Sequence, residues 1–169
     1  MCQFLQETFD EDGTRKNNFI DFEKKHLCRV YFVLSDPIND DSCNLCVLRL
    51  KGRSYPIYGF FSISAKILYE SNLFNDQAII SKSNSVTYLI GHLCKNSSYD
   101  WSGGGLYMLQ QCFEIIESVH QKIGMNHILV ECSEGLVKYY SEQHFIEVGF
   151  NKRNNLFLMI RKVAEIHQI

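Results

Sequence analysis

The sequence lacks several features that would place it in a particular class of protein. No stretch approaches the roughly 20 consecutive apolar residues that a membrane-spanning helix needs. Only two of the 169 residues are proline, and no segment is of low complexity. The first residues do not form a basic segment followed by an apolar one, so we expect no secretory signal peptide. With 46% hydrophobic residues, we expect one domain over residues 1–169, with 1–17 poorly ordered.

The sequence also lacks an excess of charge of either sign. Its 17 lysines and arginines stand against 19 aspartates and glutamates, which gives a formal net charge of −2. It has no basic tail or arm of the kind that binds nucleic acid by electrostatic attraction. Charge alone therefore does not predict a nucleic-acid partner, although folding could still gather a local basic patch.

Cysteine is well represented, and the seven residues cannot all pair with one another. Several lie in apolar runs, as buried reduced thiols do, so we expect a cytoplasmic location. Cys43 and Cys46 form a CxxC motif, but no second CxxC or HxxxH pair follows at the spacing of a zinc site. The motif also precedes an apparent strand, whereas a redox CxxC opens a helix. We interpret these two residues as incidental thiols and predict no metal.

Alternating and helical hydrophobic patterns predict a mixed α/β (α+β) order along the chain. Both faces of the segment 86–94 are largely apolar, so we expect it to be a central strand. The expected helices are 18–27, 106–123 and 134–144, and the expected strands are 29–34, 46–50, 57–67, 86–94, 128–132, 146–149 and 156–162.

Three glycines, Gly103, Gly104 and Gly105, stand where the long helix 106–123 is expected to begin. Glycine in a helix costs about 1 kcal/mol relative to alanine, so their presence needs a local reason. A helix N-terminus has unpaired N–H groups and a partial positive charge, which together bind phosphate. Glycines let a ligand approach the backbone and allow positive φ. From the residues alone, a pyrophosphate cradle and a plain strand-to-helix turn remain equally open.

The apolar residues of this helix are expected on one stripe that faces the core: Leu106, Leu109, Phe113, Ile116 and Ile123. Two familiar glycine motifs do not fit the segment before it. A P-loop needs GxxxxGK[ST], and no Lys-Ser or Lys-Thr follows these glycines. The dinucleotide-binding GxGxxG motif would need a glycine where Met108 stands.

The order of motifs over about residues 55–163 resembles the GNAT superfamily of acetyl-CoA-dependent N-acetyltransferases. Gly103 and Gly105 match the two glycines of its [Q/R]xxGxG/A loop, which lies between a central strand and a long helix. The segment 139–145 (YYSEQHF) resembles the family's FYEKxGF. The two strands before the loop look like those of bacterial GNAT enzymes, including toxin–antitoxin toxins.

The resemblance implies a GNAT fold, in which a mostly antiparallel twisted sheet with a splayed strand pair is flanked by helices. It also implies acetyl-CoA as co-substrate, no metal, and direct transfer of acetyl to a primary amine. Tyr140 matches the tyrosine that protonates the departing thiolate, which makes it the expected catalytic residue. The expected cofactor-binding residues are Leu93, Lys95, Trp101, Ser102, Gly103, Gly104, Gly105, Leu106 and Ser133.

Three positions depart from the family's pattern. Asp100 replaces a glutamine or arginine, Ser133 an asparagine, and His144 a glycine. An acidic side chain beside a pyrophosphate is unfavourable unless it points away. A non-catalytic GNAT-like module, which binds CoA or a protein partner, is therefore the alternative function.

No general base stands out in the sequence. Glu131 could relay a proton through water, although a solvated charge at a strand end is the simpler interpretation. His92 is more simply a packed histidine. An α-amino group with a pKa near 8 needs no dedicated base.

The acceptor amine is not visible in the sequence. Small amines and amino groups of proteins remain open. Aminoacyl-tRNA is the alternative if the chain is toxin-like, and nucleic acid is a partner only in that case. No membrane partner is expected, and a homodimer is possible.

Overall fold

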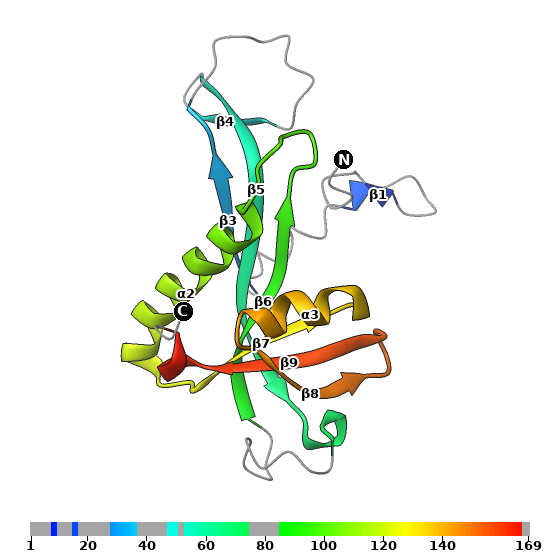
Figure 1. Ribbon diagram of the computed structural model, residues 1–169. Coiled ribbons are helices and arrows are strands. Elements are labelled where there is room, and N and C mark those ends of the chain that lie inside the picture. Colours follow the sequence, from blue (N-terminus) through cyan, green and yellow to red (C-terminus); the bar gives the residue numbers. More distant parts are fainter. Residues whose placement is uncertain are drawn as a thin grey trace. The chain divides into compact units, whose positions relative to one another are not determined.

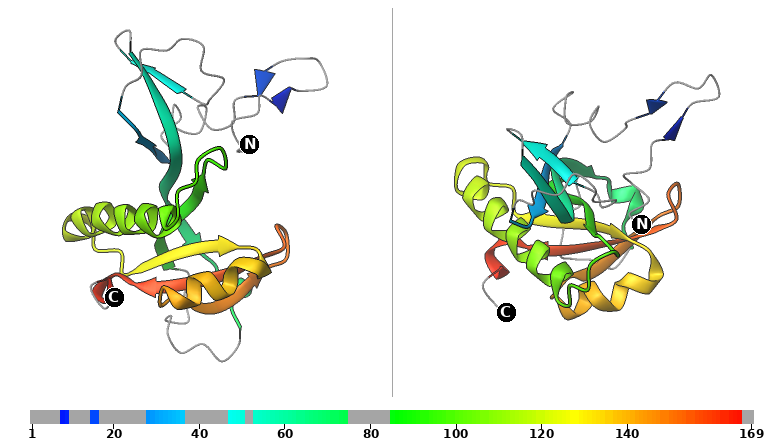
Figure 2. Two further views of the ribbon diagram at one scale, coloured as in Figure 1. Left: turned by 45° about the horizontal axis from the view of Figure 1, so that its top comes forward. Right: turned by 90° about the horizontal axis from the view of Figure 1, so that it is seen from above.

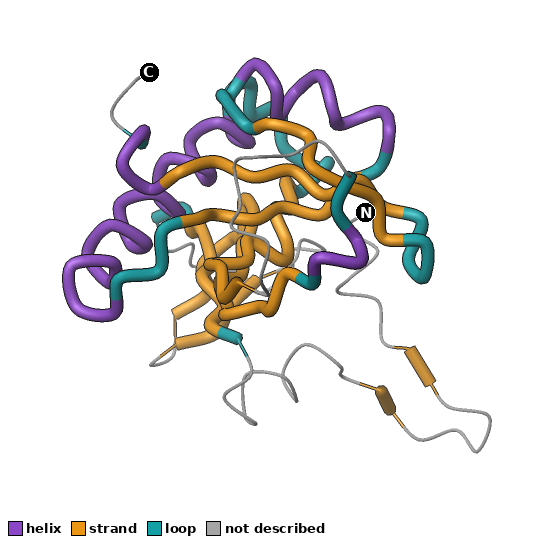
Figure 3. The backbone as a smooth tube through the Cα atoms, turned by 90° about the horizontal axis from the view of Figure 1, so that it is seen from below, coloured by secondary structure: helices purple, strands orange, loops and turns teal. Residues whose placement is uncertain are grey.

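The computed structural model describes residues 8–9, 15–16, 28–36, 47–50, 53–74 and 85–166 (Figure 3). The expected helix 18–27 and the pair Cys43 and Cys46 lie outside the described residues. Across the described ranges, no helix is long and apolar enough to cross a membrane. No cluster of three or more histidine, cysteine, aspartate or glutamate side chains in them could hold a metal ion.

The chain divides into two compact units. Unit one comprises residues 1–62 and 92–111, and unit two comprises residues 63–91 and 112–169. Three elements contribute residues to both units, namely β5 (Arg53–Leu68), β6 (Ser85–Lys95) and α2 (Gly104–Ile123). The expectation of a single domain over the whole chain stays a prediction.

Unit one contains the first four strands and the start of α2. Strand β3 (Arg29–Leu34) and strand β4 (Val47–Leu50) both pair with β5. Cross-strand aromatic pairs support the pairing of β3, because such contacts stabilise neighbouring strands. The rings of Tyr31 and Phe61 stack with centroids 5.0 Å apart.

Two short strands are described within residues 1–17 of unit one. Strand β1 (Thr8–Phe9) pairs antiparallel with strand β2 (Arg15–Lys16). Each strand is only two residues long, which is too short to leave an alternating pattern in the sequence.

Unit two is built on β7 (His127–Cys132), β8 (Ile146–Asn151) and β9 (Leu156–Lys162). β9 lies between the other two strands (Figures 1 and 2) and pairs antiparallel with both. Strand β7 also pairs parallel with β6. Helix α3 (Glu134–Glu142) packs against β8 and β9. Two short 3₁₀ helices, η2 (Glu70–Asn72) and η3 (Val163–Glu165), complete the unit. Five of its buried residues form an apolar cluster: Leu68, Leu129, Val148, Leu158 and Ile160.

The hydrogen-bonding order of the sheet is β3-β5-β6-β7-β9-β8, with β4 also paired to β5. The chain is therefore α+β with a mixed sheet, and β6 is a central strand, as the sequence predicted. All seven expected strands from 29 onward are confirmed. β5 begins at Arg53, earlier than expected, because Pro56 does not interrupt it. Proline cannot donate a hydrogen bond, but its carbonyl accepts one from the Ser35 N–H at 3.0 Å.

The two predicted helices that the structure describes are confirmed, with corrections. Helix α2 begins at Gly104, two residues earlier than expected, and Gly124 ends it with φ at 74°. Ile123 was wrongly placed on the buried stripe: it is the last residue of the helix and is mostly exposed. The buried apolar side chains of α2 are those of Met108, Leu109, Cys112, Phe113 and Ile116.

Helix α3 ends at Glu142, earlier than predicted, because the backbone turns left-handed at His144. His144 has φ at 62°, and the next N–H, that of Phe145, donates to the Tyr140 carbonyl at 3.0 Å. A left-handed residue other than glycine costs roughly 1–2 kcal/mol. This strain accounts for the glycine that the GNAT pattern has here.

Replacing His144 with glycine is expected to stabilise the protein. Relief of the left-handed strain exceeds the extra chain entropy of glycine, so the free energy of unfolding should rise by about 0.5–1 kcal/mol. Urea denaturation followed by circular dichroism measures this change. His144→Ala keeps the β-carbon and serves as the control, so it should give no gain. A loss of stability in the glycine variant would show that contacts of the His144 side chain outweigh the strain.

Candidate functional site

The loop that leads from β6 to α2 begins at a buried asparagine in unit one. The Asn96 side chain donates to the Ile57 carbonyl at 2.9 Å and accepts from the Ser98 N–H at 3.0 Å. Its main-chain N–H donates to the Tyr58 carbonyl at 2.8 Å. An asparagine that accepts from the N–H two residues on forms a side-chain turn. Asn96 therefore fixes the start of the loop against β5.

Two of the three glycines have distinct structural reasons. Gly103 has φ at 74°, in the left-handed region that favours glycine. Gly104 has the indole of Trp101 against it, and a β-carbon there would lie 2.5 Å from two of the indole carbons. The left-handed backbone at Gly103 and the packing of the Trp101 indole against Gly104 therefore explain why glycine stands at these two positions.

The end of the loop and the first turn of α2 present main-chain N–H groups that have no acceptor among the described residues. The Trp101 N–H donates to the Tyr99 carbonyl at 3.0 Å, and the Gly104 N–H donates to the Trp101 carbonyl at 3.3 Å. Over the described ranges, no acceptor is found for four other N–H groups, and the first turn of the helix has no acidic residue. The four belong to Ser102, Gly103, Gly105 and Leu106. Together with the helix dipole, these groups can hold an anion.

Lys95 adds a cation to this end of the helix. It is exposed, and its Nζ donates to the main-chain carbonyl of Trp101 at 3.2 Å. The parallel ladder of β6 with β7 ends at Ile90, whereas β6 continues to Lys95. Leu93, the other expected residue of this strand, is half-buried. Asp100 is exposed, so water can solvate its carboxylate.

Sequence reasoning missed a cluster of aromatic rings around the loop. Tyr58 meets Tyr99 edge to face with centroids 4.5 Å apart and lies 5.9 Å from Trp101. The ring centroid of Trp101 is 5.6 Å from that of Tyr107. No sequence signal identifies this cluster, because Tyr58 lies on a strand far from the loop in sequence.

His92, one of the candidate bases, belongs to unit one and contacts two other residues of that unit. Its Nδ1 lies 2.9 Å from the Ser62 hydroxyl oxygen, and its ring is tilted against that of Phe60. Burial lowers the pKa of His92, so the imidazole is neutral at pH 7. These contacts are those of the packed histidine that the sequence favoured.

Tyr140 lies on α3 in unit two and is 7% exposed. Its ring meets those of Tyr139 and Phe145 edge to face, at 5.1 Å and 5.6 Å. The Tyr139 hydroxyl is buried without an acceptor among the described residues, and burial raises the pKa of Tyr139. Ser133 is exposed at the start of α3, and its hydroxyl does not cap the helix.

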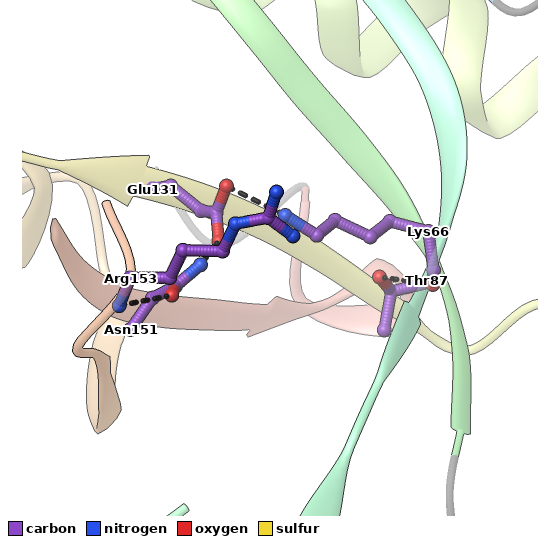
Figure 4. A network of polar contacts seen from close by, with 5 residues as sticks. All are labelled: Lys66, Thr87, Glu131, Asn151 and Arg153. Carbon is purple, nitrogen blue, oxygen red and sulfur yellow. Dashed lines mark hydrogen bonds and ion pairs between the residues drawn. The ribbon is translucent and has the colours of Figure 1, made fainter. Parts of the chain in front are cut away.

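Glu131, the candidate proton relay, forms part of a polar network in unit two (Figure 4). One carboxylate oxygen accepts from Lys66 Nζ at 2.6 Å, and the other accepts from the Asn151 amide at 3.1 Å. The side chain of Glu131 is 13% exposed, so the expectation of a solvated charge is wrong. Lys66 is 65 residues away in sequence, which is why no local pattern revealed the pair.

No protein-family model and no curated protein match the sequence, but solved structures match the fold. A tyrosine-to-phenylalanine mutant of KacT has a TM-score of 0.66 at 15% identity, covering 99% of this chain and 91% of KacT. AtaT complexed with acetyl-methionyl-tRNAfMet has a TM-score of 0.64 at 14% identity, covering 99% and 91%. AtaTR bound with AcCoA has a TM-score of 0.62 at 14% identity, covering 99% and 90%.

The chain has the GNAT fold. The resemblance that the sequence predicted is thereby confirmed for the architecture. Within this GNAT fold, unit one brings together the residues of β6 and of the loop: Leu93, Lys95, Trp101, Ser102, Gly103, Gly104, Gly105 and Leu106. The other two expected residues, Ser133 and Tyr140, belong to unit two.

Proposed function

We propose that the protein is an N-acetyltransferase that transfers acetyl from acetyl-CoA to a primary amine. The observation that carries the proposal is a set of four N–H groups that have no acceptor among the described residues, in a chain with the GNAT fold. They lie at the end of the loop between β6 and α2 and in the first turn of α2. A solved structure of the same fold, AtaTR, is bound with AcCoA.

The loop would hold the pyrophosphate of acetyl-CoA. The N–H groups of Ser102, Gly103, Gly105 and Leu106 would donate to the phosphate oxygens, and Lys95 adds a positive charge. The main chain of β6 around Leu93 and Lys95 would pair with the pantetheine arm. A main-chain N–H there would also polarise the thioester carbonyl.

The chemistry needs the two reactants in line and one proton for the leaving group. The amine nitrogen attacks the thioester carbon, so a C–N bond forms and the C–S bond breaks. The nitrogen loses one proton to solvent, the departing thiolate takes one from the phenol of Tyr140, and the phenolate of Tyr140 then regains a proton from solvent. Glu131 has both oxygens engaged, so the amine is expected to react without a dedicated base.

For the acceptor we propose the α-amino group of an aminoacyl-tRNA. The support is the solved structure of AtaT complexed with acetyl-methionyl-tRNAfMet, which has the same fold. Structures of related fold also contain a bound antitoxin segment or DNA, so an antitoxin-like protein partner belongs to the same proposal. A cytoplasmic location and a homodimer stay predictions from the sequence.

The second candidate is a GNAT-like module that binds CoA without catalysis. The observation that favours it is the strained His144 in the segment that carries Tyr140, at a position where the GNAT pattern has glycine. This candidate predicts ligand binding without turnover.

The test combines a thermal shift with an assay for the CoA thiol. Acetyl-CoA should raise Tm, and thiol release should follow with aminoacylated tRNA but not with the same tRNA after deacylation. Release with a small amine or a peptide instead would replace the proposed acceptor. A thermal shift with no turnover on any amine would favour the binding module. If CoA and acetyl-CoA both leave Tm unchanged, the proposed function is wrong.

A further inference from the structure

We infer that Tyr107 and Trp101 form a stacking site for the adenine ring of CoA. The inference rests on the proposed function, because it assigns a place to one further part of the same co-substrate. Tyr107 lies in the first turn of α2 and is 45% exposed, so much of its ring is open to solvent. An exposed tyrosine beside the only tryptophan of the chain is a surface on which a planar base can stack.

The planes of the two rings are inclined to each other, so the rings form an angled surface. Their centroids are 5.6 Å apart and their planes are inclined by 57°. A planar base can therefore stack on one ring while its edge meets the other. Adenine suits this arrangement because aromatic rings attract one another in both stacked and edge-to-face geometries.

Contacts with two other residues, Gly104 and Tyr58, hold the Trp101 indole in place. Gly104 provides the space for the indole, since a β-carbon would lie 2.5 Å from it. On another side Trp101 contacts Tyr58, which in turn meets Tyr99 at 4.5 Å. A ring that is already ordered loses little conformational entropy when a ligand binds.

The position of Tyr107 fits the nucleotide end of the co-substrate. The Tyr107 N–H donates to the Gly103 carbonyl at 3.0 Å, so Tyr107 lies one helical turn after Gly103 and directly follows Leu106, the last of the four residues whose N–H lacks an acceptor. Side chains on a helix lean toward its N-terminus, which brings the ring over that turn. In a nucleotide, one ribose separates the base from its phosphates. Phosphates held by the N–H groups and Lys95 would therefore leave the base beside these rings.

The test measures CoA affinity of Tyr107→Leu, which keeps an apolar side chain but removes the ring. Stacking of a base on one aromatic ring is worth about 1–3 kcal/mol, so the Kd for CoA should rise about 5- to 150-fold. The Kd for 4′-phosphopantetheine, which has no adenine, should stay unchanged. Quenching of Trp101 fluorescence on titration with CoA reports binding, because the chain has one tryptophan.

Two further variants are matched controls. Tyr107→Phe keeps the ring and should retain the affinity for CoA. Tyr69→Leu removes a tyrosine of unit two that is 49% exposed, and it should also leave the affinity unchanged.

The outcomes separate this inference from the function on which it rests. If the unaltered protein does not bind CoA, the proposed function fails and the stacking site fails with it. If it binds CoA and Tyr107→Leu binds equally well, the stacking site is wrong and the proposed function stands. If Tyr107→Leu binds CoA normally but loses affinity for aminoacyl-tRNA, the ring contacts an RNA base and the assignment to CoA is overturned.

Discussion

Tyr140→Phe is expected to lower kcat of acetyl transfer by about 10²- to 10⁴-fold, the usual contribution of a positioned general acid. The phenol supplies the proton that the departing thiolate needs, and phenylalanine cannot. The affinity for acetyl-CoA should be unchanged, because the pyrophosphate is proposed to bind to the loop after β6 and not to Tyr140. Steady-state thiol release gives kcat, and a thermal shift with acetyl-CoA gives the binding comparison.

Tyr139→Phe is the matched control for this experiment. Tyr139 precedes Tyr140 on α3, and its hydroxyl is buried with no acceptor among the described residues. Removing an unbonded buried hydroxyl should leave stability equal or slightly improved and should leave kcat unchanged. Equal losses in the two variants would indicate a packing effect, and full activity of Tyr140→Phe would remove Tyr140 from the mechanism.

Arg161→Ala is expected to lower the free energy of unfolding by about 3–5 kcal/mol, because it removes three hydrogen bonds from a charged donor and leaves a cavity. Arg161 is 2% exposed, and its guanidinium donates to the main-chain carbonyls of Gln143, Glu165 and Ile166 at 2.9, 2.6 and 3.2 Å. It also lies over the ring of Phe113, 4.9 Å from the centroid. Alanine would leave three carbonyls without these donors and a cavity in unit two.

A second variant, Arg161→Met, separates the effect of losing the hydrogen bonds from the effect of leaving a cavity. Methionine restores most of the volume without any donor, and it also removes the cost of burying a cation, which here lowers the pKa of the guanidinium. We expect a smaller loss than for alanine but a clear one. Urea denaturation measures both variants. If methionine is as stable as arginine, the three hydrogen bonds contribute no net stability.

Local patterns were sufficient to predict most elements of the fold. Alternation marked the strands, and the apolar stripe and Gly124 marked α2 and its end. The predicted ends of elements were wrong where a single residue decided them. One such residue is Pro56, which lies within β5 and whose carbonyl accepts a hydrogen bond. Another is His144, where the backbone turns left-handed.

The candidate site was predictable only where its residues are neighbours in sequence. The glycines and the loop could be found because a helix mouth after a central strand has a known chemistry. The contact of Trp101 with Tyr58 and the ion pair of Glu131 with Lys66 join residues from distant parts of the chain. Neither leaves a local pattern. Only the folded chain shows that Trp101 is seated on Gly104.

The position of β9 between β7 and β8 has a consequence for how the protein folds. β9 follows both β7 and β8 in sequence, yet both strands pair with it. Until residues 156–162 pair with it, β7 therefore has no antiparallel neighbour and presents an open edge. Open edges invite pairing with other chains. A partly folded chain in which β9 is not yet in place should therefore be the form most prone to aggregation.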